Sequence, residues 1–234
     1  LPTADDFFAP HVDPQTALAL RVVETHLERM LPKSTMRVLT PYLQGARKAL
    51  HGKPVEKWLD KVRLIPRSQQ LLPPSVDGAI AGVVHEALLE GRQIAAKYKK
   101  RGAVRAKDVD LHPAGLVYRD SVGTLLARAD KYGDIYQYQL HRFVDANLLP
   151  AKATLPPGFD LDAYIRDGEL AFRIGDEIAL ELRLEDDVAV SLEETPLAPN
   201  QTLKPRPDGR VALKARVMDT LILRSWLLSF GARV

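Results

Sequence analysis

Basic and aromatic side chains are concentrated in the middle of this 234-residue chain, where they could bind an anion and stack on bases. Residues 91–148 contain 11 Lys or Arg against 6 Asp and no Glu, a net charge of +5 in a chain whose total is +3. Arginine binds phosphate through paired hydrogen bonds, and aromatic rings stack on nucleobases. These residues are Tyr98, Tyr118, Tyr136, Tyr138, Lys97, Arg105, Arg119, Arg128 and Arg142. Their combination predicts a surface for a nucleic acid or a nucleotide.

Each of these side chains also has a purely structural interpretation. Tyrosines on alternating strands can be core residues, and the basic turn at 99–101 can be a solvated loop. Arg142 can brace the fold through carbonyl groups or an acidic neighbour. His112 precedes Pro113 and can be a structural turn residue.

Enzymatic motifs are absent from the sequence. The six histidines lack the spacing of a zinc protease motif, and the absence of cysteine excludes thiolate metal sites and a cysteine nucleophile. There is no Gly-rich phosphate loop and no G-x-S-x-G elbow. An acidic stretch at 176–187 flanks a predicted strand, so its carboxylates are expected to be solvated strand ends rather than metal ligands. The sequence therefore predicts a protein that is not an enzyme, with no catalytic residue, no metal and no cofactor.

The first part of the chain has helical periodicity. Two amphipathic helices are expected at 13–30 and 34–50, and the short turn between them predicts antiparallel packing. A short third helical turn follows, and a strand is expected at 62–65. We expect residues 1–74 to form a helical linker and dimerisation module.

The pattern changes after a helix expected at 77–90, which Gly91 should end. Short alternating segments with closely spaced turns are typical of a small barrel. The five expected strands cover residues 93–99, 104–111, 116–119, 122–128 and 135–140. A helical segment at 141–148 should follow them. We expect residues 75–155 to form a five-stranded β-barrel domain.

Residues 156–234 begin a new pattern after a Pro-Pro-Gly linker. The expected elements are a helix at 161–167, strands at 178–184, 202–206 and 211–217, and a helix at 219–230. This order is typical of a split βαβ, ferredoxin-like α/β sandwich whose final strand would start at Ala232 and is cut off. The fold class predicted for the whole chain is α+β.

Three motifs lie in the middle part: LHPAGLVYRD at 111–120, VGTLL at 122–126 and YQLHR at 138–142. Together they resemble the WYL domain of bacterial transcriptional regulators. The segments FDLDAY at 159–164, ETPL at 194–197 and WLLSFG at 226–231 resemble the extension that often follows this domain. The opening helices resemble the linker that precedes it, so the resemblance covers nearly the whole chain.

This resemblance implies an Sm-like, or SH3-like, barrel whose basic groove senses short single-stranded DNA or nucleotides. It also implies a winged helix-turn-helix that would lie outside this chain. Thr124-Leu125-Leu126 stands where the family has Trp-Tyr-Leu, so a contact made by the motif tyrosine does not carry over. Tyr136 stands where many members have arginine.

Arg142 matches the arginine of the family motif and is the first candidate for an anion contact. His141 and Gln139 share one strand face beside it. Tyr118 and Arg119 leave opposite faces of their strand, so at most one should line the groove. The full set of candidate ligand-binding residues is Arg142, His141, Gln139, Tyr118, Arg119, Arg128, Arg105 and His112.

We therefore expect the ligand-sensing and dimerising region of a transcriptional regulator. It should bind a single-stranded oligonucleotide or nucleotide as effector, and reach operator DNA through a domain not in this chain. A cytoplasmic homodimer without membrane contact is expected, since no run approaches the roughly 18 apolar residues of a membrane span. The alternative is a protein–protein assembly module whose groove, with its altered Thr124-Leu125-Leu126 motif, no longer binds ligand.

Overall fold

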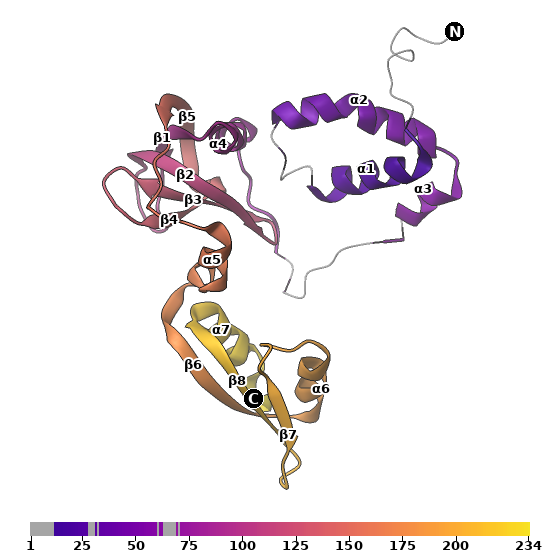
Figure 1. Ribbon diagram of the computed structural model, residues 1–234, viewed down its shortest axis with the longest axis vertical. Coiled ribbons are helices and arrows are strands. Elements are labelled where there is room, and N and C mark those ends of the chain that lie inside the picture. Colours follow the sequence, from indigo (N-terminus) through magenta and orange to yellow (C-terminus); the bar gives the residue numbers. More distant parts are fainter. Residues whose placement is uncertain (1–11, 28–30, 32, 60, 63–68, 70) are drawn as a thin grey trace. The chain divides into compact units, whose positions relative to one another are not determined.

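Two antiparallel helices, α1 (Pro14–Leu27) and α2 (Lys33–Leu50), open the part of the chain that the computed structural model describes, which is residues 12–234 except 28–30, 32, 60, 63–68 and 70 (Figure 1). The Asp13 carboxylate caps α1 by accepting hydrogen bonds from the N–H groups of Gln15 and Thr16, at 3.0 and 3.1 Å. Fully buried Ala17, near the start of α1, packs with Ala46 and Leu50 near the end of α2, as antiparallel packing requires. The short helix α3 (Pro54–Leu59) follows. Most of the strand expected at 62–65 lies outside the described residues.

A five-stranded antiparallel sheet follows helix α4 (Gly78–Glu90). The Asp77 side chain caps the start of α4, and Gly91 ends it with a left-handed φ of 61°. The strand order is β4-β3-β2-β1-β5. The strands are β1 (Arg92–Tyr98), β2 (Lys107–Arg119), β3 (Val122–Ala129), β4 (Ile135–Gln139) and β5 (Phe143–Lys152).

Two sequence predictions in this region were wrong. The strands expected at 104–111 and 116–119 form one strand, β2, because the bulge between Pro113 and Gly115 bends the chain without ending its pairing with β3. The segment 141–148 is not a helix. It consists of a single 3-10 turn, η3 (Leu140–Arg142), followed by β5, which pairs with β1.

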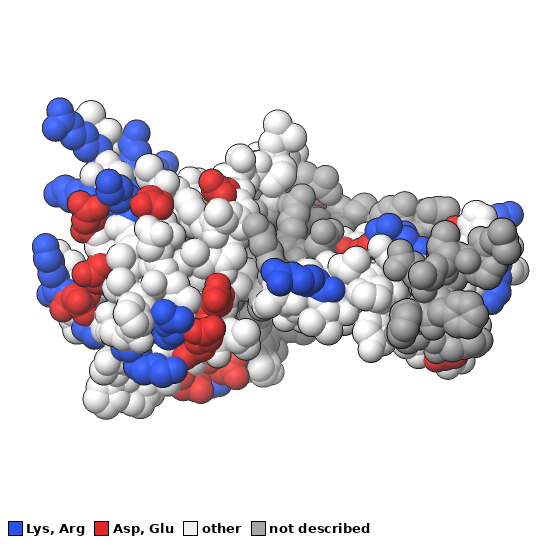
Figure 2. All heavy atoms as spheres, turned by 90° about the horizontal axis from the view of Figure 1, so that it is seen from above, with Lys and Arg blue, Asp and Glu red and all other residues white. Residues whose placement is uncertain are grey.

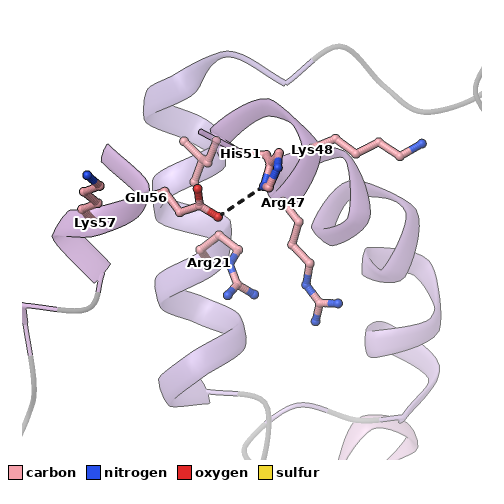
Figure 3. A pocket seen from close by; sticks show the side chains of 7 residues that line it. Arg21, Arg47, Lys48, His51, Glu56 and Lys57 are labelled. Carbon is pink, nitrogen blue, oxygen red and sulfur yellow. Dashed lines mark ion pairs between the residues drawn. The ribbon is translucent and has the colours of Figure 1, made fainter. Parts of the chain in front are cut away.

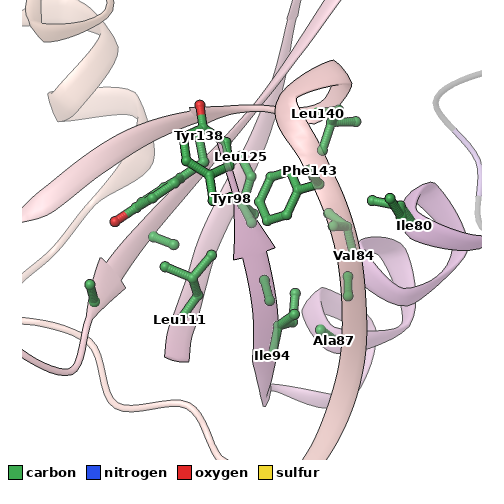
Figure 4. Close-up of a cluster of buried hydrophobic side chains, with 14 residues drawn as sticks. Ile80, Val84, Ala87, Ile94, Tyr98, Leu111, Leu125, Tyr138, Leu140 and Phe143 are labelled. Carbon is green, nitrogen blue, oxygen red and sulfur yellow. The ribbon is translucent and has the colours of Figure 1, made fainter. Parts of the chain in front are cut away.

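The core of this sheet lies between its inner face and α4 (Figure 4). Ile80, Val84 and Ala87 of α4 pack against residues of β1, β2 and β3. Tyr98, Tyr138 and Phe143 form an aromatic group in the same core: Tyr98 contacts both of the other rings edge to face, at 5.0 Å between centroids. This group joins the ends of β1 and β4 to the start of β5.

The edge strands of the sheet, β4 and β5, are consecutive in sequence and joined only by η3. The two edges must therefore approach each other at this end. Among the described residues no hydrogen-bonded ladder joins β4 to β5, so the sheet is not closed. The number of strands agrees with the prediction, although the five predicted strands form only four and β5 takes the place of the predicted helix. Closure into a barrel is not seen among the described residues.

The C-terminal part contains a three-stranded antiparallel sheet of order β6-β8-β7. Helices α6 and α7 contribute Val188, Leu192 and Trp226 to a single core with one face of this sheet, and Phe230, which follows α7, packs against the same core. The elements are α5 (Leu161–Arg166), η4 (Glu169–Ala171), β6 (Arg173–Leu184), α6 (Asp186–Glu194), β7 (Thr202–Pro205), β8 (Val211–Thr220), α7 (Leu221–Ser229) and η5 (Gly231–Arg233). The strand expected from Ala232 is replaced by η5, whose Arg233 carbonyl accepts a hydrogen bond from the Glu185 N–H at 3.0 Å.

The chain divides into two compact units, 1–156 and 157–234. The boundary lies at the Pro-Pro-Gly segment that the sequence indicates as a linker. The further division of the first unit into a helical module and a sheet domain stays a prediction. Among the described helices, none has the length and apolarity needed to cross a bilayer.

Candidate ligand-binding site

The turn η3 lies where the two edges of the five-stranded sheet meet, and hydrogen bonds fix its backbone from both sides. The Lys99 N–H donates to the Arg142 carbonyl at 3.0 Å. The Gln139 N–H donates to the Tyr98 hydroxyl, also at 3.0 Å. Leu140, buried in the core, anchors the turn between these two bonds. His141 and Arg142 are therefore held on a well-supported part of the backbone.

The Arg142 side chain is half-buried and makes no hydrogen bond or ion pair with any residue that the structure describes. A guanidinium group carries five N–H donors and stays charged at any physiological pH. The interpretation of Arg142 as a brace requires a carbonyl or carboxylate partner, and none is found among the described residues. Its donors are available for an anion.

His141 has a polar atom that the fold leaves unsatisfied. Its Nδ1 atom is buried and has no hydrogen-bond partner among the described residues. Burial and, to a lesser degree, the charge of Arg142 lower the pKa of the imidazole, so the ring is neutral at neutral pH. Leaving a buried polar atom unpaired costs about 1–3 kcal/mol, and a ligand that hydrogen-bonds to it recovers part of that cost.

Tyr118 reaches the same turn from β2. A Cβ atom on Gly123 would lie 2.8 Å from Leu140 Cδ1 and 3.0 Å from the Tyr118 ring, so both side chains pack over this glycine. Burial raises the pKa of the half-buried Tyr118 phenol. Arg119, the next residue, is exposed and points to the opposite face, as the strand alternation predicts.

The other tyrosines of the basic segment separate into core and surface. Tyr98 and Tyr138 are 6% and 7% exposed, so the interpretation as core residues holds for both. Burial, together with neighbouring tyrosines, raises the pKa of Tyr138 to about 12. Tyr136 is exposed and contacts Tyr132 edge to face at 5.5 Å. Tyr136 is therefore the one of these four with a largely open ring face.

His112 and Arg128 lie at the other end of the pairing between β3 and β4. The Thr154 N–H donates to His112 Nδ1 at 2.8 Å, so the ring proton is on Nε2, which donates to the Asp130 carboxylate. This hydrogen bond lowers the pKa of Asp130. Arg128 Nε donates to the Thr154 carbonyl at 2.9 Å. These residues pin the segment after β5 to β2 and β3, and they do not join the residues around η3.

Replacing His112 with Ala should destabilise the protein by about 1–3 kcal/mol, because the Thr154 N–H and the Asp130 carboxylate lose their partner. Urea denaturation followed by circular dichroism measures this change. Oligonucleotide binding, measured under native conditions, should be unchanged. A variant that loses binding at unchanged stability would instead place His112 in the ligand site.

Arg105 lies in the connection between β1 and β2, which we call the basic loop. Its basic residues are all exposed: Lys99, Lys100, Arg101 and Arg105. The hydrogen bond from Lys99 to Arg142 places the start of this loop beside η3. Lys and Arg side chains gather at the left edge of Figure 2, the side on which Figure 1 draws the five-stranded sheet, with Asp and Glu among them. The loop can attract an anion towards η3, but the surrounding surface carries both signs of charge.

Gln139, His141 and Arg142 thus lie at η3, Tyr118 packs with Leu140 of that turn over Gly123, and the backbone of Lys99 is hydrogen-bonded to Arg142. The sequence does not single out Lys99 as a site residue. The pairing of β1 with β5 could have identified Lys99, had the segment after 142 been predicted as a strand. No group of His, Asp or Glu within the described part of the chain could hold a metal ion.

Comparison with known proteins yields two family matches. The WYL domain model matches residues 79–148, and the WCX domain model matches residues 176–234. Among solved structures, the chain is similar to proteasome accessory factor B/C (PafBC) of Arthrobacter aurescens, with 22% identity and a TM-score of 0.36. That match covers 74% of this chain and 26% of the other, so this chain spans about a quarter of the length of its relative. Among curated proteins, none matches.

The first match contains the sheet, most of α4 and the turn η3, and the second contains most of the C-terminal unit. The resemblance carried by the motifs at 111–120, 122–126 and 138–142 is confirmed. This chain belongs to the WYL-domain proteins and carries a WYL domain followed by a WCX domain.

Proposed function

We propose that this chain is the ligand-sensing and dimerising region of a bacterial transcriptional regulator, and that η3 binds a single-stranded oligonucleotide or a nucleotide. The observation that carries this proposal is the pair formed by the buried Nδ1 of His141 and the guanidinium of Arg142, neither of which has a hydrogen-bond partner in the described part of the chain. A phosphate group accepts hydrogen bonds and carries negative charge, so it would satisfy both side chains.

The neighbouring residues support a nucleic-acid-type ligand. The basic loop supplies positive charge next to η3, which attracts a polyanion over several ångströms. Tyr118 borders the turn and Tyr136 offers an open ring on the neighbouring strand, so one or both can stack on a base. Gln139 supplies an amide that can hydrogen-bond to a base edge or a phosphate. We assign Arg128 and His112 a structural role, in which they hold the segment after β5 against β2 and β3.

The proposal also includes the fold type of the sheet domain and of the second unit. We infer an Sm-like barrel, because a helix precedes five antiparallel strands whose two edges are joined by a single turn. We infer a ferredoxin-like sandwich for the second unit, because two helices cover one face of its sheet. Dimerisation through the helical module, and control of operator DNA through a separate domain, complete the proposed regulator. A ligand would act by preferring one arrangement of that dimer.

The direct test is a titration of a short, fluorescently labelled single-stranded oligonucleotide with the intact chain at several salt concentrations. The affinity should fall steeply as salt rises, with a slope of about −0.7 for each phosphate contacted. A complete lack of binding to oligonucleotides and nucleotides, even at low salt, contradicts the proposal.

The affinity for an oligonucleotide should rise as the pH falls from about 8 to about 5.5, because His141 starts with a lowered pKa. A phosphate beside the ring favours its charged form and raises its pKa, so binding takes up a proton. Anisotropy titrations across this range, with an oligonucleotide that lacks a terminal phosphate, measure the effect. Replacing His141 with Gln should remove the pH dependence, and an unchanged dependence in that variant would assign the proton uptake elsewhere.

One observation favours the alternative of an assembly module. Leu125 and Leu126, in the altered motif, are fully buried and offer no side chain to a ligand. That function predicts a stable dimer whose mass and operator binding do not respond to any oligonucleotide. Light scattering of the chain with and without the oligonucleotide separates the two functions.

A further inference from the structure

The outer edge of β6 carries backbone groups that no other strand of its unit covers. Every residue of the C-terminal unit is described, and there β6 pairs with β8 alone, at one edge of the three-stranded sheet (Figure 1). The N–H of Glu185, just after β6, points to this edge, because it donates to the Arg233 carbonyl. Peptide groups alternate in direction along a strand, so those of the odd-numbered residues in 177–183 point to the same edge.

This edge lacks the usual protection against pairing with another chain. Edge strands are commonly short, or carry proline or inward-pointing charges. By contrast, β6 has 12 residues and no proline, and its regular register with β8 runs without interruption over 177–184. Leu182 packs against the core, so strand alternation places Ile178 and Leu180 on the same face. Ile178 is still 36% exposed, so this face has apolar surface to cover.

Helix α7 borders the same edge. Its Leu221 N–H donates to the Phe172 carbonyl, next to the start of β6, at 3.1 Å. The bond between Glu185 and Arg233 holds the turn after α7 at the end of β6. The helix therefore runs along β6, and it is mostly apolar, yet none of its residues is buried. Such a helix beside an open strand edge indicates that further apolar surface packs there.

The charges on the other face of β6 indicate which strand fits. Glu177 and Arg183 lie three residues before and three residues after Leu180. Arg183 is exposed, and its side chain has no hydrogen bond or ion pair with a described residue. Glu177 accepts a hydrogen bond from Arg216 on Oε2, at 2.8 Å, and a carboxylate has further acceptor positions on its other oxygen.

A second copy of β6, antiparallel and centred on Leu180, complements both faces of the strand. Glu177 of each copy then lies opposite Arg183 of the other, and Ile178 lies opposite Leu182. The odd-numbered residues, whose peptide groups face the edge, lie opposite one another, so each such pair exchanges two hydrogen bonds. The segment is therefore self-complementary in charge, in apolar surface and in backbone hydrogen bonding.

Neighbouring registers fit less well. A centre at Ala179 or at Glu181 places glutamates of the two copies opposite each other, which is destabilising. A centre at Leu182 needs the Glu185 N–H for the ladder, and that group already donates to Arg233. The register centred on Leu180 avoids both conflicts.

We propose that β6 pairs with β6 of a second copy of this chain in this register, so that two three-stranded sheets join into one continuous sheet. Each copy contributes the same residues to the contact, as a two-fold axis through Leu180 requires. This interface is separate from η3 and from the helical module.

A cysteine introduced at the two-fold axis tests the pairing in the full chain, which has no cysteine of its own. In Leu180→Cys the two Cα atoms lie about 4.5 Å apart, a distance that a disulfide spans. Mild oxidation should therefore give a covalent dimer on a non-reducing gel. Ile178→Cys is the matched control: it lies on the same face, but the two copies of this position are about 13 Å apart, so its yield should be about tenfold lower.

Charge reversal tests the register. In the Leu180→Cys chain, Arg183→Glu should lower the yield about tenfold, because glutamates then face each other at both ends of the pairing. Glu177→Arg should do the same, and a mixture of the two chains should recover the yield. Lys204→Glu is the control, since Lys204 is exposed on β7, at the opposite edge of the sheet. It should leave the yield within about twofold.

Circular dichroism checks that each variant is folded. If Leu180→Cys does not fold, a mixture of Ala179→Cys and Glu181→Cys chains replaces it, because both positions are exposed and lie opposite each other in the dimer. Three results overturn the proposal: no covalent dimer, equal yields for Leu180→Cys and Ile178→Cys, or equal losses in Arg183→Glu and Lys204→Glu.

Dimerisation through the helical module cannot produce these differences. All the substitutions lie in the C-terminal unit, so the contacts that join the helices of the module are the same in every variant. These contacts include the ion pair of Glu24 with Arg47, and Glu56 at 3.7 Å from His51 Nδ1 (Figure 3). The outcome is also independent of whether η3 binds an oligonucleotide.

Discussion

Replacing Arg142 with Ala is expected to weaken the binding of a short single-stranded oligonucleotide about ten- to hundredfold. A charge-assisted hydrogen bond contributes about 1.5–3 kcal/mol, and each 1.4 kcal/mol corresponds to a factor of ten in affinity. The stability of the protein should hardly change, because the Arg142 side chain makes no hydrogen bond or ion pair with a described residue. Anisotropy titrations and urea denaturation of the same preparations measure both quantities.

Arg101→Ala is the matched control for this experiment. Arg101 is an exposed residue of the basic loop, so its loss removes one charge from the same end of the sheet. It should reduce the affinity only severalfold, through the general attraction of the loop, and Arg142→Lys should retain part of the binding. If Arg101→Ala and Arg142→Ala have equal effects, the loop attracts the ligand non-specifically and η3 is not its binding site.

Replacing Leu125 with Ala should lower the free energy of unfolding of the WYL domain by about 2–5 kcal/mol. Leu125 lies on β3 and is fully buried in the core of the sheet. Its register partner on β4 is Tyr138, which belongs to the aromatic group beside η3. Truncation removes apolar contacts and leaves a cavity. Denaturant unfolding followed by circular dichroism measures the loss.

Leu89→Ala provides the comparison, because Leu89 lies on α4 and is 68% exposed. The same atoms are removed there, but the stability should stay within about 0.5 kcal/mol of the parent protein. Equal effects of the two substitutions would show that Leu125 does not lie in a well-packed core.

The sequence predicts most of the elements because its signals are local. The helices expected from Asp13 and from Asp77 begin there, each capped by the aspartate side chain, and Gly91 ends the second as predicted. Alternating residues correctly indicate the first four strands, apart from the bulge at Pro113 that merges two of them. The prediction of a helix at 141–148 is wrong, because the strand conformation of β5 depends on pairing with β1, about 50 residues earlier in the chain.

The candidate site could be predicted only as a set of residue types. The motif at 138–142 correctly draws attention to His141 and Arg142. Only the structure shows that the Arg142 side chain has no hydrogen-bond partner among the described residues, whereas the Arg128 side chain donates a hydrogen bond to the Thr154 carbonyl. Pairing of this kind depends on contacts between distant segments, so composition and spacing do not reveal it.

The central claim is that His141 and Arg142 bind the phosphate of an oligonucleotide, and the imidazole resonances of His141 test it most directly. Nitrogen-15 spectra of the histidine rings can be recorded during an oligonucleotide titration, with His141→Gln used for assignment. We predict that the His141 Nδ1 resonance shifts on binding, while that of His112, held by Thr154 and Asp130, stays in place. Saturable oligonucleotide binding without any change at His141 would contradict the account.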